Sequence, residues 1–279
     1  MEAPDPHPSP PTTVGATIPE VSLVMPVFNG AAFIARNLEK SREFLGSRIA
    51  KFEIVVIDDG STDGTANLVE ELTGDCLSLL RMPSNQGKYA ALKAGMSAAS
   101  GSCRIFTDAD LPYDLEAVPY IEHLVNDRRF HLVVGDRTLT ESETLAPSGA
   151  VRSLTTRAFS FFVRMLVTGE LFDTQCGLKG FRSDVAESLF PLLTDDGFSG
   201  DVELLYVALK YNLEIRRIPV RLQRSAPSTV SLAAHSLPML ARIAGLRSNW
   251  TSGRYHSERL RSLASQAYWQ RKNTGGSRA

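Results

Sequence analysis

Apolar and polar residues alternate in blocks along the first half of the chain, and the blocks have the lengths of strands and helices. Short apolar runs that are rich in β-branched residues predict strands. Five runs have this character: Val21–Pro26, Phe52–Ile57, Leu77–Leu80, Arg104–Thr107 and His131–Val134. Runs that are apolar almost throughout are typical of parallel strands covered on both faces. The pattern therefore predicts a mostly parallel sheet between layers of helices.

Helical periodicity fills the segments between these runs. Apolar residues three or four positions apart mark one face of a helix. Four such stripes are present: Ile34, Leu38 and Leu45; Ala66, Val69 and Leu72; Leu92, Met96 and Ala99; Val118, Ile121 and Val125. Repeated strand–helix–strand units predict a doubly wound α/β sheet. In such sheets, ligands bind beyond the carboxyl ends of the strands.

Two aspartates, Asp108 and Asp110, stand one residue apart at the end of the predicted strand 104–107. Alternate residues of an extended segment point the same way, so both carboxylates could share one cation. Two carboxylates leave coordination positions open for phosphate oxygens, which is how enzymes that act on nucleotides usually hold Mg²⁺. The pair is either such a metal site or a solvated turn.

A second acidic loop, Asp59 to Glu70, has the ligand spacing of an EF-hand calcium site. An EF-hand needs a helix before its loop, whereas residues 52–57 are strand-like, so we reject calcium. The predicted strand-to-helix turns carry neither the Walker P-loop pattern nor Gly-x-Gly-x-x-Gly. Nucleotide binding through either of these motifs is therefore excluded.

Composition narrows the class of protein further. The 279 residues are 43% hydrophobic and 22% charged with a net charge of −1, which is typical of soluble domains and argues against nucleic-acid binding. Cys76, Cys103 and Cys176 are far apart, so they predict neither a disulfide framework nor a zinc site. A reduced compartment fits this cysteine usage best.

The chain divides into three predicted parts. Residues 1–19 are proline-rich and lack an apolar stretch of signal-peptide length, which predicts a disordered leader. Residues 20–246 would form one domain, and residues 247–279 a basic, partly disordered tail. The most apolar later stretch, 159–167, is interrupted by Arg164 and is shorter than the about 18 residues of a membrane span.

Four motifs occur in a specific order: Val24–Asn29, Val55–Thr65, Asn85–Lys88 and Asp108–Asp110. Together they resemble family 2 glycosyltransferases of the GT-A fold. Further segments, Gly135–Arg137, Arg152–Arg157 and Asp173–Arg182, are similar to the polyprenyl-phosphate branch, the dolichyl-phosphate mannose and glucose synthases. The Asp-Thr-Gln-Cys-Gly sequence at 173–177 is closer to the glucosyltransferases. The resemblance extends from about Val21 to about Leu246.

The resemblance implies two groups of binding residues. Those expected around the nucleotide sugar are Pro26, Phe28, Asp58, Gly87, Lys88, Asp108 and Ala109. Those expected at the acceptor or at phosphate groups are Arg137, Arg152, Arg157, Gln175, Arg224 and Ser228. Asp108 and Asp110 would hold Mg²⁺ or Mn²⁺, and a guanidinium suits phosphate oxygens. For each arginine, the alternative is a surface charge.

Two departures from the family pattern affect this comparison. Many relatives carry an acidic residue where this chain has Gly30, so one donor contact is missing. The segment from Arg224 to Val230 lacks the Gly-x-Ser-Lys ending that is common in relatives. The segment that the resemblance assigns to the acceptor therefore departs from the family pattern.

The implied reaction is inverting, metal-dependent transfer of a hexose from UDP-glucose or GDP-mannose to a polyprenyl phosphate. A lipid phosphate is already ionised near neutral pH, whereas a hydroxyl acceptor would need a general base. Asp201 is the candidate base, or else it caps the helix that follows it; Arg137 joins it and the Asp108–Asp110 pair as a catalytic candidate. The alternatives are a soluble or glycolipid hydroxyl acceptor, a non-catalytic sugar-nucleotide-binding protein and a nucleotidyltransferase.

A water-insoluble acceptor predicts peripheral contact with the cytoplasmic face of a membrane. Phe159 to Leu171 could offer an apolar face flanked by arginines, or it could be a core helix. The basic tail contains Trp250, Tyr255, Tyr268 and Trp269, and it suits an anionic surface unless it is simply solvated. A second copy of the chain, in a homo-oligomer, is a further candidate partner.

Overall fold

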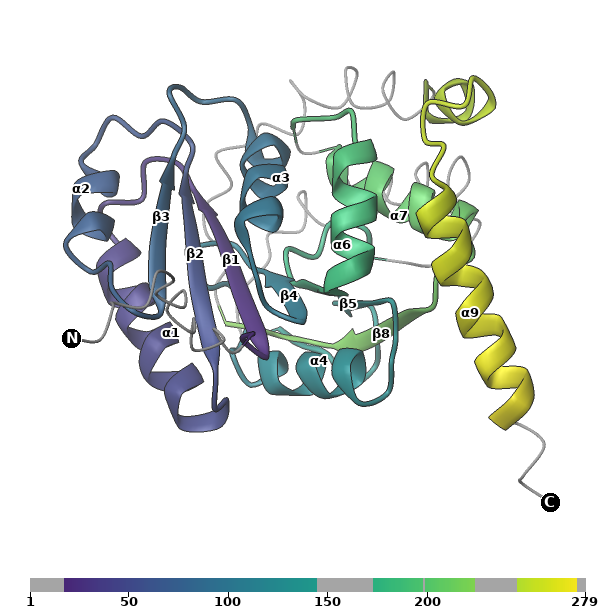
Figure 1. The fold of residues 1–279 in the computed structure, drawn as a ribbon. Helices are drawn as coiled ribbons and strands as arrows, with labels where there is room; N and C mark the ends of the chain where they lie inside the picture. The colour runs from purple at the N-terminus through teal and green to yellow at the C-terminus, as the bar shows by residue number, and fades with distance from the viewer. Residues whose placement is uncertain (1–17, 145–172, 198, 224–244, 275–279) are drawn as a thin grey trace, which may run out of the picture.

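The computed structural model describes residues 18–144, 173–197, 199–223 and 245–274. Its centre is a seven-stranded sheet of order β3-β2-β1-β4-β7-β5-β8 (Figure 1). The strands are β1 Val21–Val27, β2 Phe52–Asp58, β3 Leu77–Arg81, β4 Cys103–Phe106, β5 Leu132–Asp136, β7 Lys179–Arg182 and β8 Ile215–Pro219. Neighbouring strands are parallel, except that β7 runs antiparallel to both β4 and β5. A separate two-stranded sheet joins β6 Glu143–Thr144 to β9 Arg221–Leu222.

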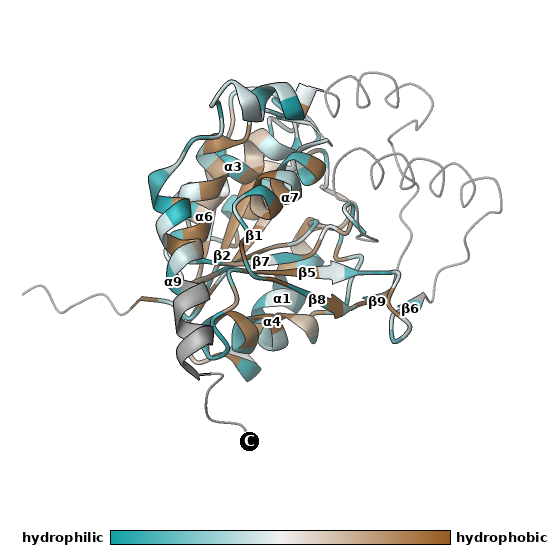
Figure 2. Cartoon of the chain, turned by 90° about the vertical axis from the view of Figure 1, so that its right-hand side faces the viewer, coloured by the Kyte–Doolittle hydropathy of each residue, from teal (hydrophilic) through white to brown (hydrophobic). Residues whose placement is uncertain are grey.

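Helices cover both faces of the large sheet, as the sequence predicted. The helices are α1 Ile34–Arg48, α2 Thr65–Glu70, α3 Lys88–Ala98, α4 Ala117–Asn126, α6 Ser183–Leu189, the 3₁₀ turn η2 Phe190–Leu192, α7 Gly200–Lys210 and α9 Glu258–Thr274. Buried residues of α1, α2 and α4 pack with one face, and those of α3, α6, α7 and α9 pack with the other. Figure 2 shows hydrophobic residues on the central strands between the two layers.

Strand β1 illustrates how two cores arise from one sheet. Successive side chains of a strand point to opposite faces. Leu23 and Met25 pack with the α1 and α4 side, and Val24 packs with the α3 side. All three are fully buried, which is why the strand reads as a continuous apolar run rather than an alternating one.

Strand β7 was not predicted as a strand. It pairs with β4 on one side and β5 on the other, so that Gly180 lies opposite both Ile105 and Val133. A side chain at Gly180 would collide with Ile121 of α4. The glycine therefore lets α4 lie close to the middle of the sheet.

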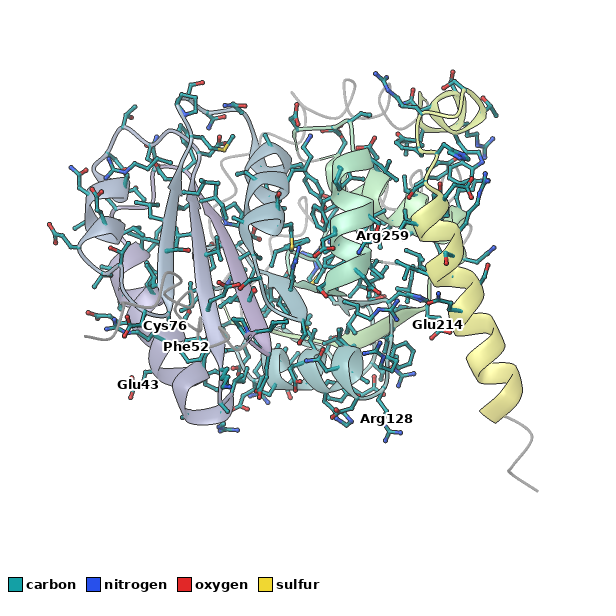
Figure 3. The ribbon with its side chains drawn as sticks, viewed as in Figure 1. Glu43, Phe52, Cys76, Arg128, Glu214 and Arg259 are labelled. Atoms are coloured by element: carbon teal, nitrogen blue, oxygen red, sulfur yellow. The ribbon has the colours of Figure 1, made fainter. Side chains whose placement is uncertain are left out.

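The packing continues beyond residue 246, where the sequence placed the end of the domain. Leu246, Tyr255, Leu260 and Leu263 belong to the same buried cluster as α7. Arg259, labelled in Figure 3, lies against α6 and pairs with Glu187 at 3.0 Å. Residues 245–263 are therefore part of the folded domain.

The aromatic residues of this segment face the protein. Tyr255 is 1% exposed, so its predicted role at a membrane surface is wrong, because its ring lies in the core. The ring of Trp250 contacts those of Tyr206 and Tyr211, with centroid separations of 6.4 and 5.4 Å. Phe159 to Leu171 lies outside the described residues. No helix in the described part of the chain combines the length and the apolar character needed to span a bilayer.

Candidate active site

The carboxyl ends of β2 and β4 bring predicted site residues to one edge of the sheet. Asp58 ends β2, and Asp108 follows β4 by two residues. Asp58 is 3% exposed; its Oδ2 accepts a hydrogen bond from the Ser61 amide at 3.3 Å, and its Oδ1 has no partner among the described residues. A buried carboxylate oxygen without a donor is costly, which makes Asp58 a candidate for binding a ligand N–H or O–H group.

A pocket of about 450 Å³ opens beside Asp58. Its walls come from the ends of β2 and β3, the turns that follow them and the start of α2: Asp58, Gly60, Ser61, Thr62, Gly64, Ala66, Asn67, Arg81, Met82 and Pro83. Pro26 lies within β1, opposite Ile57 of β2, and Phe28 just beyond β1 is 47% exposed. The predicted nucleotide residues of β1 and β2 therefore lie on adjacent strands.

The acidic loop after β2 holds the neighbouring loops together. Asp59 accepts hydrogen bonds from the amides of Gln86 and Gly87 at 2.7 and 2.9 Å. Asp63 accepts from the Ala31 amide at 3.0 Å and from Thr65, and the bond from Thr65 contributes most to lowering the pKa of Asp63. Of the carboxylates that matched a calcium loop, Asp59 and Asp63 are thus bound to backbone amides and a hydroxyl group, and Glu70 pairs with Arg81 at 2.5 Å.

Gly87 permits the turn that leads into α3. Its φ of +104° and ψ of 156° lie in a region that is essentially restricted to glycine. A side chain there would also collide with the carbonyl oxygen of Asp196. The sequence placed Gly87 near the nucleotide, and the structure gives it a backbone role at the start of the helix that carries Lys88.

Lys88 pairs with Asp108 at the end of β4. Burial alone would lower the pKa of Lys88, but the negative charges of Asp108 and Asp201 outweigh it and raise the pKa, and Asp110 adds to this effect. Lys88 is therefore cationic and lies within the field of both members of the predicted metal-binding pair. The side chain of Asp108 is 36% exposed, so one of its faces remains open to solvent.

Asp108 and Asp110 lie in a turn rather than in an extended segment. The Leu111 amide donates to the Asp108 carbonyl at 3.0 Å, and Leu111 has a φ of +49°. The prediction that an extended backbone points both carboxylates the same way is therefore wrong, because the turn sets their directions. The Ala109 carbonyl accepts from Asn37 at 2.9 Å, which fixes the turn against α1. Two partly exposed carboxylates on a fixed turn suit a hard divalent cation.

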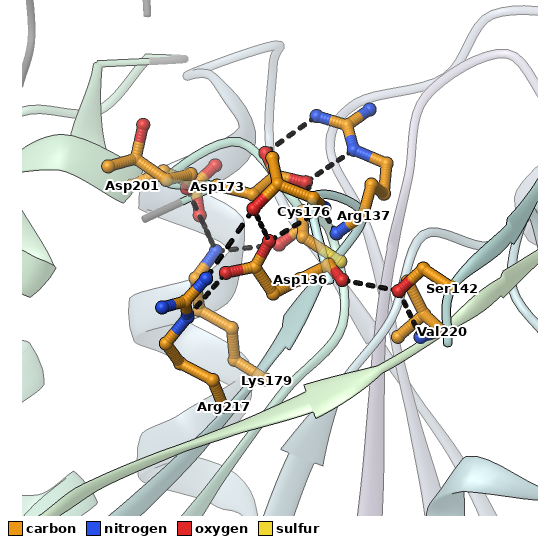
Figure 4. Close-up of polar contacts among 11 residues, drawn as sticks. Asp136, Arg137, Ser142, Asp173, Cys176, Lys179, Asp201, Arg217 and Val220 are labelled. Atoms are coloured by element: carbon orange, nitrogen blue, oxygen red, sulfur yellow. Dashed lines mark hydrogen bonds and ion pairs between the residues drawn. The ribbon is translucent and has the colours of Figure 1, made fainter. Parts of the chain in front are cut away.

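Asp201 and Lys179 form an ion pair in the protein interior (Figure 4). Lys179 is completely buried, and it also donates to the carbonyls of Cys176 and Thr174 at 2.6 and 3.2 Å. Tyr89 donates to Asp201 at 2.8 Å. Because Ser199 is the N-cap residue of α7 and no side-chain cap bond is formed there, the alternative of Asp201 as a helix cap is wrong.

The sequence reasoning missed Lys179. An ammonium group has three donors, and here all three are used inside the protein. The segment Gly177 to Phe181 is apolar or glycine apart from this lysine, and that contrast is the one sequence signal for a buried charge. Its partner Asp201 is 22 positions away. Only the tertiary fold brings the two together.

Arg137 binds Asp173 through two parallel hydrogen bonds (Figure 4). Burial alone would raise the pKa of Asp173, but its bonds to Arg137 hold the pKa below its ordinary value. A guanidinium has five donors, and within the described part of the chain two of those of Arg137 bind Asp173, which leaves the others to suit a second anion. Nearby, Asp136 pairs with Arg217 at 2.6 Å.

The segment 173–179 is thus held at both ends, by Arg137 and by Lys179. Between these ends, the backbone of Gly177 passes so close to Asp108 that a side chain would collide with the carboxylate. Gln175 lies in the same segment, and its buried Nε2 has no hydrogen-bond partner in the described structure. Arg152, Arg157, Arg224 and Ser228 lie outside the described residues.

We expect Gly177→Ala to displace the Asp108 carboxylate. The added methyl group has no space unless Asp108 moves, so affinity for the metal and the nucleotide that the sequence predicts should fall while the sheet stays folded. Titration of the protein with Mn²⁺ and UDP, alongside thermal unfolding, measures both effects. Gly74→Ala is the matched control, since a side chain there meets nothing within 4 Å. Equal affinity in the two variants would contradict the predicted contact.

Comparison with known proteins agrees with this geometry. Residues 22–190 match the family model described as glycosyl transferase family 2. The chain is 30% identical to a dolichyl-phosphate beta-glucosyltransferase of Dictyostelium discoideum over 84% of this chain and 75% of that protein. It is 27% identical to the human protein of the same name over 72% of this chain and 66% of that protein.

Solved structures share the fold at lower identity. Glucosyl-3-phosphoglycerate synthase from Mycobacterium tuberculosis, in complex with Mn²⁺, UDP and glucosyl-3-phosphoglycerate, has a TM-score of 0.57 and 20% identity over 81% of this chain and 80% of that one. Mannosyl-3-phosphoglycerate synthase from Rubrobacter xylanophilus has a TM-score of 0.61 and 18% identity over 85% of this chain and 76% of that one.

The sheet, the acidic turn after β4 and these matches define a glycosyltransferase of the GT-A fold. The chain belongs to glycosyl transferase family 2. The predicted family and fold are confirmed. The non-catalytic alternative is not supported, because the relatives are named glycosyltransferases.

Proposed function

We propose that this protein transfers glucose from UDP-glucose to a polyprenyl phosphate. The observation that carries the proposal is the meeting of Asp108, Asp110 and Lys88 beside the carboxyl end of β4, where a sugar diphosphate would be held. The names of the relatives support glucose and a dolichyl-phosphate acceptor. The UDP in a structural neighbour supports the choice of nucleotide.

The donor would lie along the edge of the sheet. In the proposal, Asp58 and the pocket beside it receive the nucleoside, and the diphosphate lies between Asp108, Asp110 and Lys88. Mg²⁺ or Mn²⁺ held by the two aspartates would stabilise the negative charge of the leaving diphosphate. Lys88 adds a fixed positive charge at the same place. Because Lys88 is largely buried, little water competes with the diphosphate for this charge.

The acceptor would approach from the side of Arg137. Its remaining donors suit a phosphate group, and we propose that Gln175, Arg152, Arg157, Arg224 and Ser228 contribute to the same region. A phosphate oxygen attacks without losing a proton, so no general base is required. Direct displacement inverts the anomeric carbon and gives a β-linked product from an α-linked donor. This outcome agrees with the word "beta" in the names of the relatives.

The environment of Asp201 favours a phosphate over a hydroxyl acceptor. Its carboxylate is 3% exposed and binds Lys179 and Tyr89, so it serves as a buried counter-ion. A general base must instead reach the proton that it removes. A polyprenyl acceptor also requires work at a membrane surface, and we retain peripheral contact with the cytoplasmic face as part of the proposal.

A donor panel tests the proposal. Purified protein is incubated with a polyprenyl phosphate, Mn²⁺ and radiolabelled UDP-glucose or GDP-mannose, and label is measured in a lipid that mild acid hydrolyses. We expect label from UDP-glucose, at a rate about 10²- to 10³-fold lower when Asp108→Asn replaces the wild type. Transfer from GDP-mannose alone would overturn the choice of donor. Transfer only to a water-soluble hydroxyl compound would overturn the choice of acceptor.

A further inference from the structure

One buried carboxylate of α7, that of Glu203, binds the C-terminal segment. The Tyr255 hydroxyl donates to Oε1 of Glu203 at 2.6 Å and accepts from Asn249 at 3.2 Å. Both Tyr255 and Glu203 are 1% exposed. Burial, together with the bond to Glu203, raises the pKa of Tyr255 to about 12. The hydroxyl therefore remains a donor to Glu203 at neutral pH.

The same carboxylate organises the loop that precedes α7. Glu203 accepts hydrogen bonds from the amides of Thr194 and Asp195 at 2.9 and 2.8 Å, and from the Thr194 hydroxyl at 2.6 Å. A carboxylate accepts about four hydrogen bonds, so this one is fully used. The positions of Tyr255 and of residues 194–195 are thus fixed against the same two oxygen atoms.

The next residue of the loop contacts the start of α3. The Asp196 carbonyl accepts a hydrogen bond from the Tyr89 amide at 2.9 Å, and its carboxylate pairs with Lys93 at 2.5 Å. The first amides of a helix have no partner within the helix, so an external carbonyl stabilises them. Lys88, which reaches Asp108, is the first residue of this helix.

A pocket of about 280 Å³ lies beside this connection. It is lined by loop residues on one side and by the C-terminal segment on the other: Thr194, Asp195, Asp196, Ser199, Glu203, Gly245, Leu246 and Asn249. The side chains of the described residues therefore leave this space open between the loop and residues 245–249. Beside this space, the bond from Tyr255 to Glu203 is a direct polar link between the C-terminal segment and the carboxylate that holds the loop.

We propose that Tyr255 is a positioning residue for the donor site. It acts through Glu203 and residues 194–196 to hold the start of α3, and thereby sets Lys88 against Asp108. Tyr255 does not touch the donor in this arrangement. The C-terminal segment then belongs to the framework of the catalytic site, although no site residue was predicted in it.

Two tyrosine variants of the full chain test the proposal. Tyr255→Phe removes the hydroxyl bound to Glu203 and keeps the ring. Tyr211→Phe is the matched control, since its hydroxyl donates to the Tyr255 carbonyl at 2.6 Å and accepts from the Ser257 amide at 2.7 Å without touching Glu203. Both variants loosen the attachment of the segment, but only the first breaks the connection to the loop.

Hydrogen–deuterium exchange over residues 83–92 gives a readout that does not depend on the activity. We expect exchange there to be faster in Tyr255→Phe and unchanged in Tyr211→Phe. The dissociation constant of UDP with Mn²⁺, a measurement that rests on the proposed function, should rise by about fivefold in Tyr255→Phe only. If the wild type does not bind UDP, the proposed donor is wrong, and the exchange measurement still decides the role of Tyr255.

Unchanged exchange over residues 83–92 in Tyr255→Phe, or the same change in both variants, would overturn the proposal. If Tyr255→Phe does not fold, Glu203→Gln tests the same connection. A glutamine keeps one acceptor oxygen and turns the other into a donor, so it loses either the Tyr255 or the Asp195 contact. We expect it to accelerate exchange over the same residues, and unchanged exchange in this variant also contradicts the proposal.

Discussion

Replacing Asp108 or Asp110 with asparagine should lower kcat by about 10²- to 10³-fold, the usual effect of losing one group that stabilises charge in a transition state. The sheet should remain folded, because both side chains are partly exposed. Lys88 loses one partner in Asp108→Asn but keeps the nearby charge of Asp201. Initial rates with UDP-glucose and thermal unfolding measure the two effects separately.

Asp127→Asn is the control for this pair, because Asp127, the C-cap residue of α4, is exposed and pairs with the neighbouring His123 at 2.7 Å. It should leave the rate unchanged. Mn²⁺ titration in the presence of UDP should show weaker binding in both site variants. Wild-type rates in either variant, or in the presence of EDTA, would contradict the proposed metal dependence. The same result would contradict the proposed position of the diphosphate beside Asp108 and Asp110.

Asp201→Asn should destabilise the fold by about 3–5 kcal/mol, the usual cost of leaving a buried charge without its partner. The charge left behind is that of Lys179, which is completely buried. The double variant Lys179→Met/Asp201→Asn should recover part of this loss, since no unpaired charge remains. Urea unfolding of the two single variants and the double variant gives the coupling energy directly.

The same variants separate the two kinds of acceptor. With a phosphate acceptor, folded Asp201→Asn protein should retain most of its rate, because no proton is removed. A loss of about 10³-fold with an unchanged melting temperature would instead identify a general base and a hydroxyl acceptor. That single result would contradict both the structural role of Asp201 and the proposed acceptor.

The first half of the fold could be predicted because its information is local. Runs such as Phe52–Ile57 are long, apolar and flanked by helical stripes, so periodicity alone identified the strands and helices. Since parallel strands end at the same edge, the meeting of Asp58 and Asp108 followed from the fold class. The structure confirms the shared edge, although the turn at Asp108 has a different geometry.

The remainder depends on contacts between distant residues. Strand β7 has four residues, two of them charged, and β8 contains Arg216 and Arg217, so neither resembles a buried strand in sequence. The pairing of Lys179 with Asp201 requires the tertiary fold. In the C-terminal segment, charged residues surround Tyr255 and Leu260, and their abundance suggested a solvated tail where the structure has a buried face.

The position of β7 also sets an order of events during synthesis. Strands β1 to β4 leave the ribosome first and can pair with one another, but the backbone groups at the outer edge of β4 have no partner strand until β7 is made. Strands β5 and β8 join the rest of the sheet only through β7. A nascent chain that ends within residues 107–178 therefore exposes an open strand edge, where pairing with other chains competes with folding.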